Sequence, residues 1–190
     1  MTRLHSVSLL LHLLALAMWL GGIAFFLIVF GPAVHDLKAG LGLRLLNRGR
    51  ITFELLSWAA IGLLFVTGIV NLVLRSQMTG AHLGQYYLTI LSVKLLLFVA
   101  MLVHHALQVF KYGPKIASNT NRAAITTDSW PEALRADWQK WFMLLKINAT
   151  IGPIAILLGL ALVRRLTRYA RITGALQITN SPRNRRSRRL

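Results

Sequence analysis

Residues 7–30 read VSLLLHLLALAMWLGGIAFFLIVF, an apolar run that decides the fold of this chain. A helix needs about 20 apolar residues to cross the hydrocarbon core of a bilayer, which is about 30 Å thick. Similar runs follow at about 51–74, 88–110 and 143–163. They lack the alternation of barrel strands, and only helices or closed barrels satisfy their backbone groups in lipid. The sequence therefore predicts an all-α fold, an integral membrane up-and-down four-helix bundle.

The composition agrees with one transmembrane domain over residues 1–170, followed by a basic C-terminal tail over residues 171–190. Hydrophobic residues make up 55% of the 190 positions. A cleavable signal peptide is the alternative for the first run, because Arg3 precedes it and Gly21 and Gly22 are small. The apolar run continues to Phe30, which is too long and too bulky for a cleavage region. We expect the first helix to remain.

The charge is strongly basic, with 22 Lys and Arg against five Asp and Glu and a formal net charge of +17. Both sides of the predicted bundle carry Lys and Arg near the helix ends, so the positive-inside rule does not choose an orientation. The arginine-rich segment 181–190 is short and lacks aromatic residues, which argues against nucleic acid as a partner. We expect this segment to lie on anionic lipid headgroups.

The absence of cysteine limits the possible chemistry. Disulfides, thiolate metal sites and a cysteine nucleophile are excluded. A metal ion would have to be bound through imidazole, thioether or oxygen ligands. Met18, Met101 and Met143 are scattered through the runs, and we interpret them as packing residues.

Ionisable and imidazole side chains occur inside three of the four runs. They are His12, Lys94, His104, His105 and Lys146. Such side chains are costly inside a membrane and are usually functional. Their structural alternatives are plain: His12 can hydrogen-bond across helices, and Lys94 can extend its ammonium group to the interface.

The depth of these residues predicts two separate polar layers. The first and third helices run in the same direction, and His12 and Lys94 both lie about a turn and a half inside. The antiparallel helices would add Thr67, Asn71, Gly68 and Gly159 to their layer.

The second layer contains His104 and His105, about 16 Å from the first at the helical rise. It would also include Glu54, Ser57, Trp58, Lys146 and Asn148. A metal ion binds imidazole nitrogen at about 2 Å, so His12 and His104 of one chain would not share it. His104 and His105 point about 100° apart, so we expect one to face the bundle and leave open which.

Two motifs resemble a known pair of families. Leu11–Gly22 contains a histidine, a tryptophan seven residues later and then glycines, and 93–97 and 102–105 add the lysine and the paired histidines. They resemble the first and third helices of CopD-type copper-resistance membrane proteins and of the related HemJ-type protoporphyrinogen oxidases. Thr67-Gly68 fits the same pattern, and the resemblance spans about residues 5–163.

The resemblance to HemJ implies a membrane redox protein that binds haem b. HemJ-type proteins oxidise protoporphyrinogen IX and use a first-helix histidine and a third-helix lysine, which correspond to His12 and Lys94. We therefore expect His12 as an axial ligand, Lys94 as the catalytic residue and a porphyrin as substrate. The remaining cofactor-binding residues would be His104, as a second ligand site or polar relay, with His105, Trp19 and Asn148. A second axial ligand could come from another subunit.

Two other functions remain open. A CopD-like protein would transport copper ions, with His12 and His104 as metal ligands, although the methionines and histidines do not clearly line one face. The chain could instead be a non-catalytic subunit of a larger membrane complex, in contact with copies of itself or with a partner subunit through its small residues. The fourth helix lacks the acidic residue followed by proline that we associate with HemJ. In each case we expect a multi-pass protein of the bacterial inner (plasma) membrane.

Overall fold

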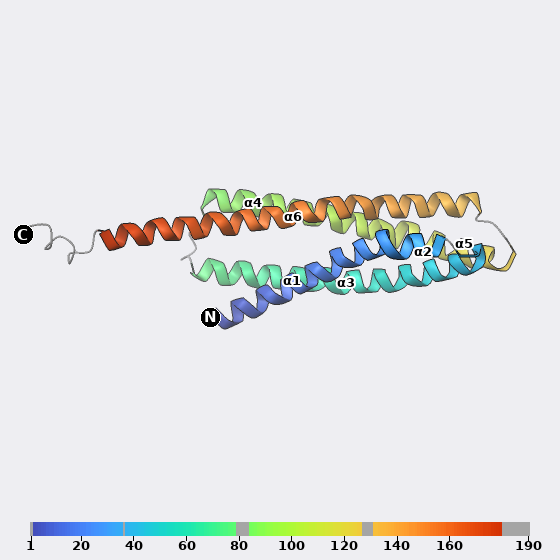
Figure 1. Cartoon of the computed structure of the whole chain (residues 1–190), viewed down its shortest axis with the longest axis horizontal. Helices are drawn as coiled ribbons and strands as arrows, with labels where there is room; N and C mark the ends of the chain where they lie inside the picture. The colour runs from blue at the N-terminus through green and yellow to red at the C-terminus, as the bar shows by residue number, and fades with distance from the viewer. Residues whose placement is uncertain (1, 36, 79–83, 127–130, 180–190) are drawn as a thin grey trace, which may run out of the picture.

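The computed structural model describes residues 2–35, 37–78, 84–126 and 131–179, and within them it contains helices and no strand. The elements in order are α1 (Thr2–Phe25), the π-helix η1 (Phe26–Phe30), α2 (Gly31–His35), α3 (Ala39–Met78), α4 (Gln85–Ala106), the π-helix η2 (Leu107–Tyr112), α5 (Gly113–Thr126) and α6 (Glu132–Thr179) (Figure 1). The predicted all-α fold is confirmed.

Four helical segments are long and apolar enough to cross a membrane. They are Arg3–His35, Ala39–Gln77, Gln85–Asn121 and Glu132–Leu160. Their outer surfaces carry leucine, valine, isoleucine and phenylalanine side chains that are exposed in the isolated chain, as lipid-facing helices require. The protein is a multi-pass membrane protein. The first three predicted spans lie within these segments, and the fourth, 143–163, lies within helix α6 (Glu132–Thr179).

The segments that connect the spans differ from the prediction. The sequence predicts that Gly113-Pro114 ends the third helix and that 118–121 form a loop. This is wrong, because η2 and α5 continue the helix to Thr126. The sequence also predicts a helix start where Glu132 follows Ser129 by three residues, and this is confirmed, because α6 begins at Glu132. Helix α6 continues to Thr179, so residues 171–179 of the expected tail are helical, and residues 180–190 lie outside the described residues.

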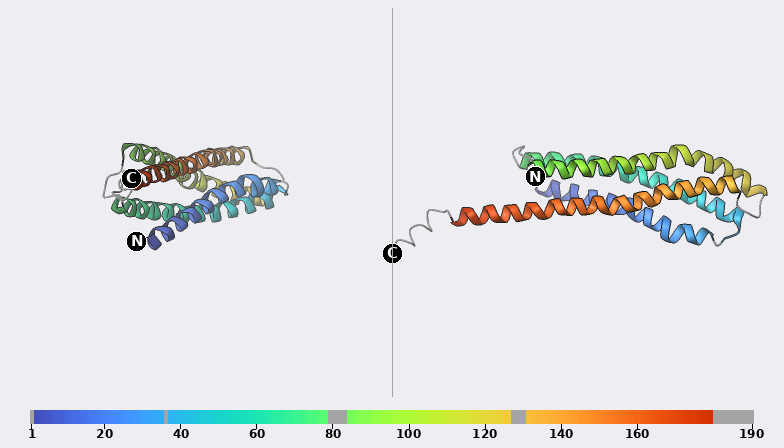
Figure 2. Two further views of the ribbon diagram at one scale, coloured as in Figure 1. Left: turned by 60° about the vertical axis from the view of Figure 1, so that its left-hand side comes forward. Right: turned by 90° about the horizontal axis from the view of Figure 1, so that it is seen from above.

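The helices pack as two pairs. Helix α1 lies along α3, and α4 lies along α6 (Figures 1 and 2). Aromatic side chains join the pairs in one core, where the ring of Trp19 lies 6.4 Å from that of Phe98 and Phe26 lies 5.2 Å from Trp141. The four-helix arrangement thus consists of two hairpin-like halves that share an aromatic centre.

The two halves repeat the same local design. In each half an apolar helix passes through a π-helix into a Gly-Pro pair and a shorter helix, and a long helix follows. The N–H of Gly31 bonds to the carbonyl of Phe26, and the N–H of Gly113 bonds to the carbonyl of Gln108. The corresponding positions differ by 82 in residue number: Gly113 corresponds to Gly31, and Gln108 corresponds to Phe26.

The pattern of buried side chains repeats with the same shift. Buried Trp19, Ile23, Phe26 and Val34 of the first half correspond to buried Met101, His105, Gln108 and Ile116 of the second. In the long helices the shift is 91 residues, and buried Leu43, Arg50, Phe53, Glu54 and Ser57 correspond to buried Leu134, Trp141, Leu144, Leu145 and Asn148. Both halves begin at the same end of the bundle (Figure 1). The order of the helices and the pattern of burial therefore indicate an internal duplication with parallel repeats, of the kind related by an axis along the membrane normal.

The π-helices explain how the apolar helices continue through proline. Proline lacks an N–H group and its ring clashes with the carbonyl four residues earlier, which normally breaks a helix. The wider π turn ends just before each Gly-Pro pair and shifts the hydrogen bond by one residue. Glycine is needed there because a Cβ at Gly31 would lie 3.0 Å from the Phe26 oxygen, and one at Gly113 would lie 2.7 Å from Arg50 Nη1.

We expect Gly113→Ala to lower the free energy of unfolding by about 1–3 kcal/mol, because the added methyl group must displace the buried Arg50 side chain. Gly62→Ala is the matched control, since a Cβ there meets no atom within 4 Å, and it should be neutral or stabilise by up to about 1 kcal/mol. Unfolding in detergent measures both. Equal effects of the two substitutions would contradict this explanation.

Candidate functional site

The first predicted layer is present around His12. The His12 Nδ1 lies 2.8 Å from the hydroxyl oxygen of Thr67, and that hydroxyl donates its proton to the carbonyl of Leu63 at 2.6 Å. The threonine oxygen must therefore accept, and His12 Nδ1–H donates to it. In the neutral ring this leaves Nε2 without a proton and free to bind a ligand.

Lys94 completes this layer from the other half of the molecule. A Cβ on Gly159 of α6 would lie 3.3 Å from Lys94 Nζ, and a Cβ on Gly68 of α3 would lie 3.7 Å from His12 Cε1. Lys94 is half-buried and lies within electrostatic reach of His12. It makes no hydrogen bond or ion pair with the residues that the structure describes. The predicted grouping of His12 with Thr67 and Gly68, and of Lys94 with Gly159, is confirmed. The Oδ1 of Asn71, the other predicted member, is buried without a hydrogen-bond partner in the described residues.

The second layer centres on His105, whose side chain is 1% exposed. Its ring lies edge-on to three aromatic rings, with centroids 6.4 Å from Trp19, 6.3 Å from Phe53 and 5.2 Å from Trp58. The Nε2 atom of His105 and the Nε1 atom of Trp19 are buried without a hydrogen-bond partner. An unpaired nitrogen in so dry a place is costly, which makes His105 a candidate ligand. The Gln108 side chain and the Glu54 backbone lie close to the same ring.

His104 also contacts the bundle. Its Nδ1 lies 3.0 Å from the Asn148 Oδ1, while the Asn148 amide donates to the carbonyl of Met101 at 3.2 Å. The expectation that one of the two histidines would face away from the bundle is wrong, because His105 is buried and His104 is half-buried against Asn148. Asn148 occupies its predicted place. Lys146 does not, because it lies two residues away, about 200° around the helix, and is exposed.

Met101 is a member of this layer that the sequence interpretation missed. It is 3% exposed and precedes His105 by four residues on α4, so both side chains lie on one buried face. Side chains at this spacing have Cβ atoms about 6 Å apart. The spacing itself was visible in the sequence, but nothing distinguished this methionine from the scattered ones until its burial was known.

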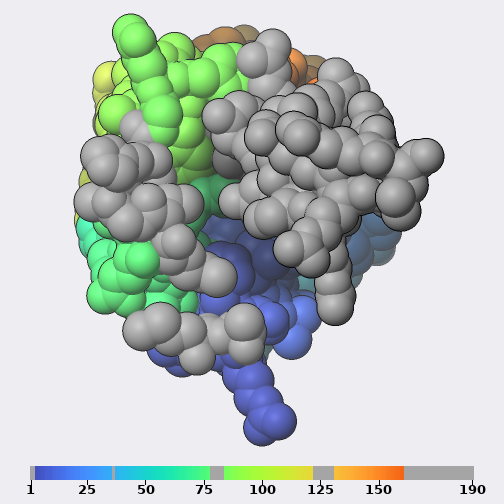
Figure 3. Space-filling view, turned by 90° about the vertical axis from the view of Figure 1, so that its left-hand side faces the viewer, coloured from blue at the N-terminus to red at the C-terminus, as the bar shows by residue number. Residues whose placement is uncertain are grey.

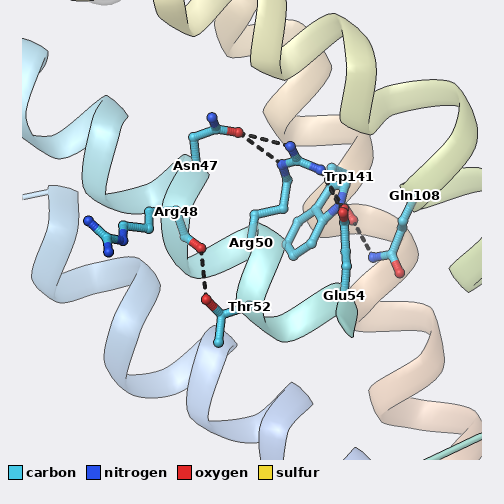
Figure 4. A network of polar contacts seen from close by, with 7 residues as sticks. All are labelled: Asn47, Arg48, Arg50, Thr52, Glu54, Gln108 and Trp141. Carbon is cyan, nitrogen blue, oxygen red and sulfur yellow. Dashed lines mark hydrogen bonds and ion pairs between the residues drawn. The ribbon is translucent and has the colours of Figure 1, made fainter. Parts of the chain in front are cut away.

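A buried ion pair lies beside the second layer (Figure 4). Arg50 Nη1 donates to both carboxylate oxygens of Glu54 at 2.7 Å, and Arg50 also donates to Asn47 Oδ1 at 3.1 and 2.9 Å. The Trp141 indole donates to Glu54 at 3.4 Å, and the Gln108 amide donates to the Trp141 carbonyl at 3.0 Å. Arg50 neutralises the Glu54 carboxylate, so this carboxylate is not a free metal ligand.

The two layers hold no larger metal centre. A group of three or more His, Asp or Glu side chains placed to bind one ion does not occur among the described residues. The expected separation agrees with this, because His12 pairs with α3 whereas His104 pairs with α6. Trp19, two turns after His12 on α1, lies between the layers and touches His105.

Comparison with known proteins finds one family. The family model described as Copper resistance protein D matches residues 50–162, which include the second layer, Lys94 and Gly159. No curated protein and no solved structure matches the chain.

We expect Arg50→Leu to cost about 3–5 kcal/mol of stability, because it leaves the Glu54 carboxylate buried without its partner. The double variant Arg50→Leu/Glu54→Leu should cost less than the single one, since it removes both charges. Unfolding of the purified protein in detergent measures the difference. A double variant as unstable as the sum of its parts would contradict a buried, coupled pair.

Proposed function

We propose that this protein, which belongs to the copper resistance protein D family, binds monovalent copper inside its membrane bundle. Copper is then the protein's cargo and not a resident cofactor. The observation that supports this most is the buried His105 Nε2, which has no partner although it lies in the dry centre of the bundle. We place the protein in the bacterial plasma membrane, where copper must cross lipid.

The ligands available at His105 favour Cu(I). Imidazole and thioether groups bind this soft ion, and a chain without cysteine has no thiolate for it. His105 supplies Nε2, and Met101 supplies a thioether one helical turn away. Two ligands suffice for Cu(I), and the surrounding Trp19, Phe53 and Trp58 rings exclude water. A divalent ion would need compensating negative charge, but Arg50 already holds the Glu54 carboxylate.

The His12 layer suits a copper cation less well. His12 offers a free Nε2, but Lys94 lies within electrostatic reach and carries the same sign of charge as the ion. We therefore assign copper to Met101 and His105, and we treat His104 as the residue that Asn148 holds beside them.

Haem b is the second candidate, and the hydrogen bond from His12 to Thr67 favours it. A ligating histidine usually donates its other ring N–H to a neighbouring group, as His12 Nδ1 does. His12 would supply one axial ligand and Lys94 would face a propionate, while a second axial ligand would come from another copy. Haem, when bound, would supply one-electron chemistry. An oxidised-minus-reduced visible spectrum of the wild type and of His12→Ala tests this: a b-type spectrum lost in the variant supports haem, and a colourless wild type contradicts it.

We expect the purified protein to take up Cu(I) from a chromogenic chelator such as bicinchoninate under reducing conditions. His105→Ala and Met101→Leu should each weaken Cu(I) binding by at least about tenfold, because each removes one of two ligands. Met143→Leu is the matched control, since this methionine is 55% exposed on α6, and its affinity should equal that of the wild type.

Other outcomes decide against the assignment. Wild-type affinity in both His105→Ala and Met101→Leu would contradict the copper site at His105. A loss that occurs with His12→Ala alone would move the site to the other layer.

A further inference from the structure

We propose that Lys94 and His12 form a binding site for a phosphate oxyanion between the two halves of the bundle. This site lies about 16 Å along α4 from the level of His105 and does not depend on copper binding there. Three observations carry it: the internal duplication, the unpaired charge and the open packing of this end.

The duplication places the two residues at equivalent positions. The shift of 82 residues that relates the two π-helices also carries His12 onto Lys94. The shift of 91 residues in the long helices carries Gly68 onto Gly159. Each of the two side chains faces the glycine of its own partner helix. Sites in duplicated membrane proteins typically form where the repeats meet, and these two residues lie together there.

The charge at this position has no counter-ion among the described residues. Lys94 forms neither a hydrogen bond nor an ion pair with them, although it lies inside a membrane span. The described carboxylates, Glu54, Glu132 and Asp137, all belong to the other end of the bundle. An ammonium group inside a membrane is costly unless it is paired. The missing partner is therefore an anion.

The packing at this end leaves space for it. On α1, Ser8 is the sole fully buried side chain before Ala15 in the described part, and on α4 Ile90 is the sole one before Met101. On α3, Thr67 is the sole fully buried side chain after Leu64 in the described part. Figure 3 looks onto this end and shows the surface hollowed between the blue of α1 and the green of α4. The glycines opposite His12 and Lys94 keep their side of the space free of side chains.

An oxyanion supplies the partner that Lys94 lacks. Lys94 offers three N–H donors and a full charge, and charged donors make the stronger hydrogen bonds to phosphate oxygens. His12 keeps its Nδ1–H on Thr67, so it donates to the oxyanion only as the imidazolium, through Nε2–H. The oxyanion can belong to a lipid headgroup, because the hollow opens at the end of the bundle, or to a free anion in solution.

The test measures binding of two probes to the protein purified in a neutral maltoside detergent. Native mass spectrometry counts bound dioleoyl phosphatidylglycerol, with phosphatidylcholine as the reference lipid, and calorimetry measures inorganic phosphate without lipid. We expect Lys94→Met to weaken binding of whichever probe the wild type binds by at least about tenfold, because it removes a charged hydrogen bond. Lys94→Arg should retain binding. Lys146→Met is the matched control, because Lys146 also lies in a membrane span but on its exposed face.

A second variant keeps the charge and reduces the space. Gly159→Ala would place a methyl group 3.3 Å from Lys94 Nζ and should also weaken binding. Selective phosphatidylglycerol binding that depends on Lys94 supports a headgroup site, and phosphate binding without lipid that depends on Lys94 supports a soluble anion. Binding unchanged in Lys94→Met, an equal loss in Lys146→Met, or no binding of either probe by the wild type would each overturn the proposal.

Discussion

Lipid supplies no hydrogen bonds, so every polar group inside the spans must find its partner within the chain or in a ligand. This constraint explains the unbroken helices, because even Pro32 and Pro114 are accommodated by π turns rather than by loops. It also explains why Arg50 and Glu54 form a closed pair with Asn47 and Trp141. Among the groups without a partner in the described residues, Lys94 and His105 Nε2 can bind a ligand by charge or by a nitrogen lone pair, so they are the informative ones.

The duplication provides a nearly symmetric frame on which the two halves differ in chemistry. His105 occupies the position that Ile23 holds in the first half, and Leu145 occupies the position of Glu54. Trp19, in the first half, corresponds to Met101 in the second. Most of these polar residues therefore have an apolar or different residue at the corresponding position of the other half. The shared arrangement of helices provides the scaffold, and the residues that differ between the halves provide the sites. In the two layers, two pairs of corresponding residues are polar in both halves, Ser57 with Asn148 and His12 with Lys94, and in the second pair each residue faces a glycine.

The two polar layers are built differently. Around His105 the aromatic core is dense and its fixed charges are paired, which suits a monovalent soft cation held away from water. Around Lys94 the packing is open and the charge is unpaired, which suits an anion. A single chain can hold both because the two environments lie at different depths and share only Trp19 and its neighbours as the boundary.

The membrane location, the four spans, the helix start at Glu132 and the two polar layers follow from the sequence alone, because hydrophobic length and helical rise are local properties. Depth alone also placed His12 with Lys94 and His104 with Asn148. The packing of the helices fixes what depends on the direction of side chains around each helix: both His104 and His105 contact the bundle, Lys146 faces outward, and Met101 shares a buried helix face with His105. The tertiary structure also decided the continuation of the helices through the Gly-Pro pairs. Periodicity gives a residue's height along a helix, but which face of the helix is buried depends on the neighbouring helices, and these are fixed only when the two repeats pack together.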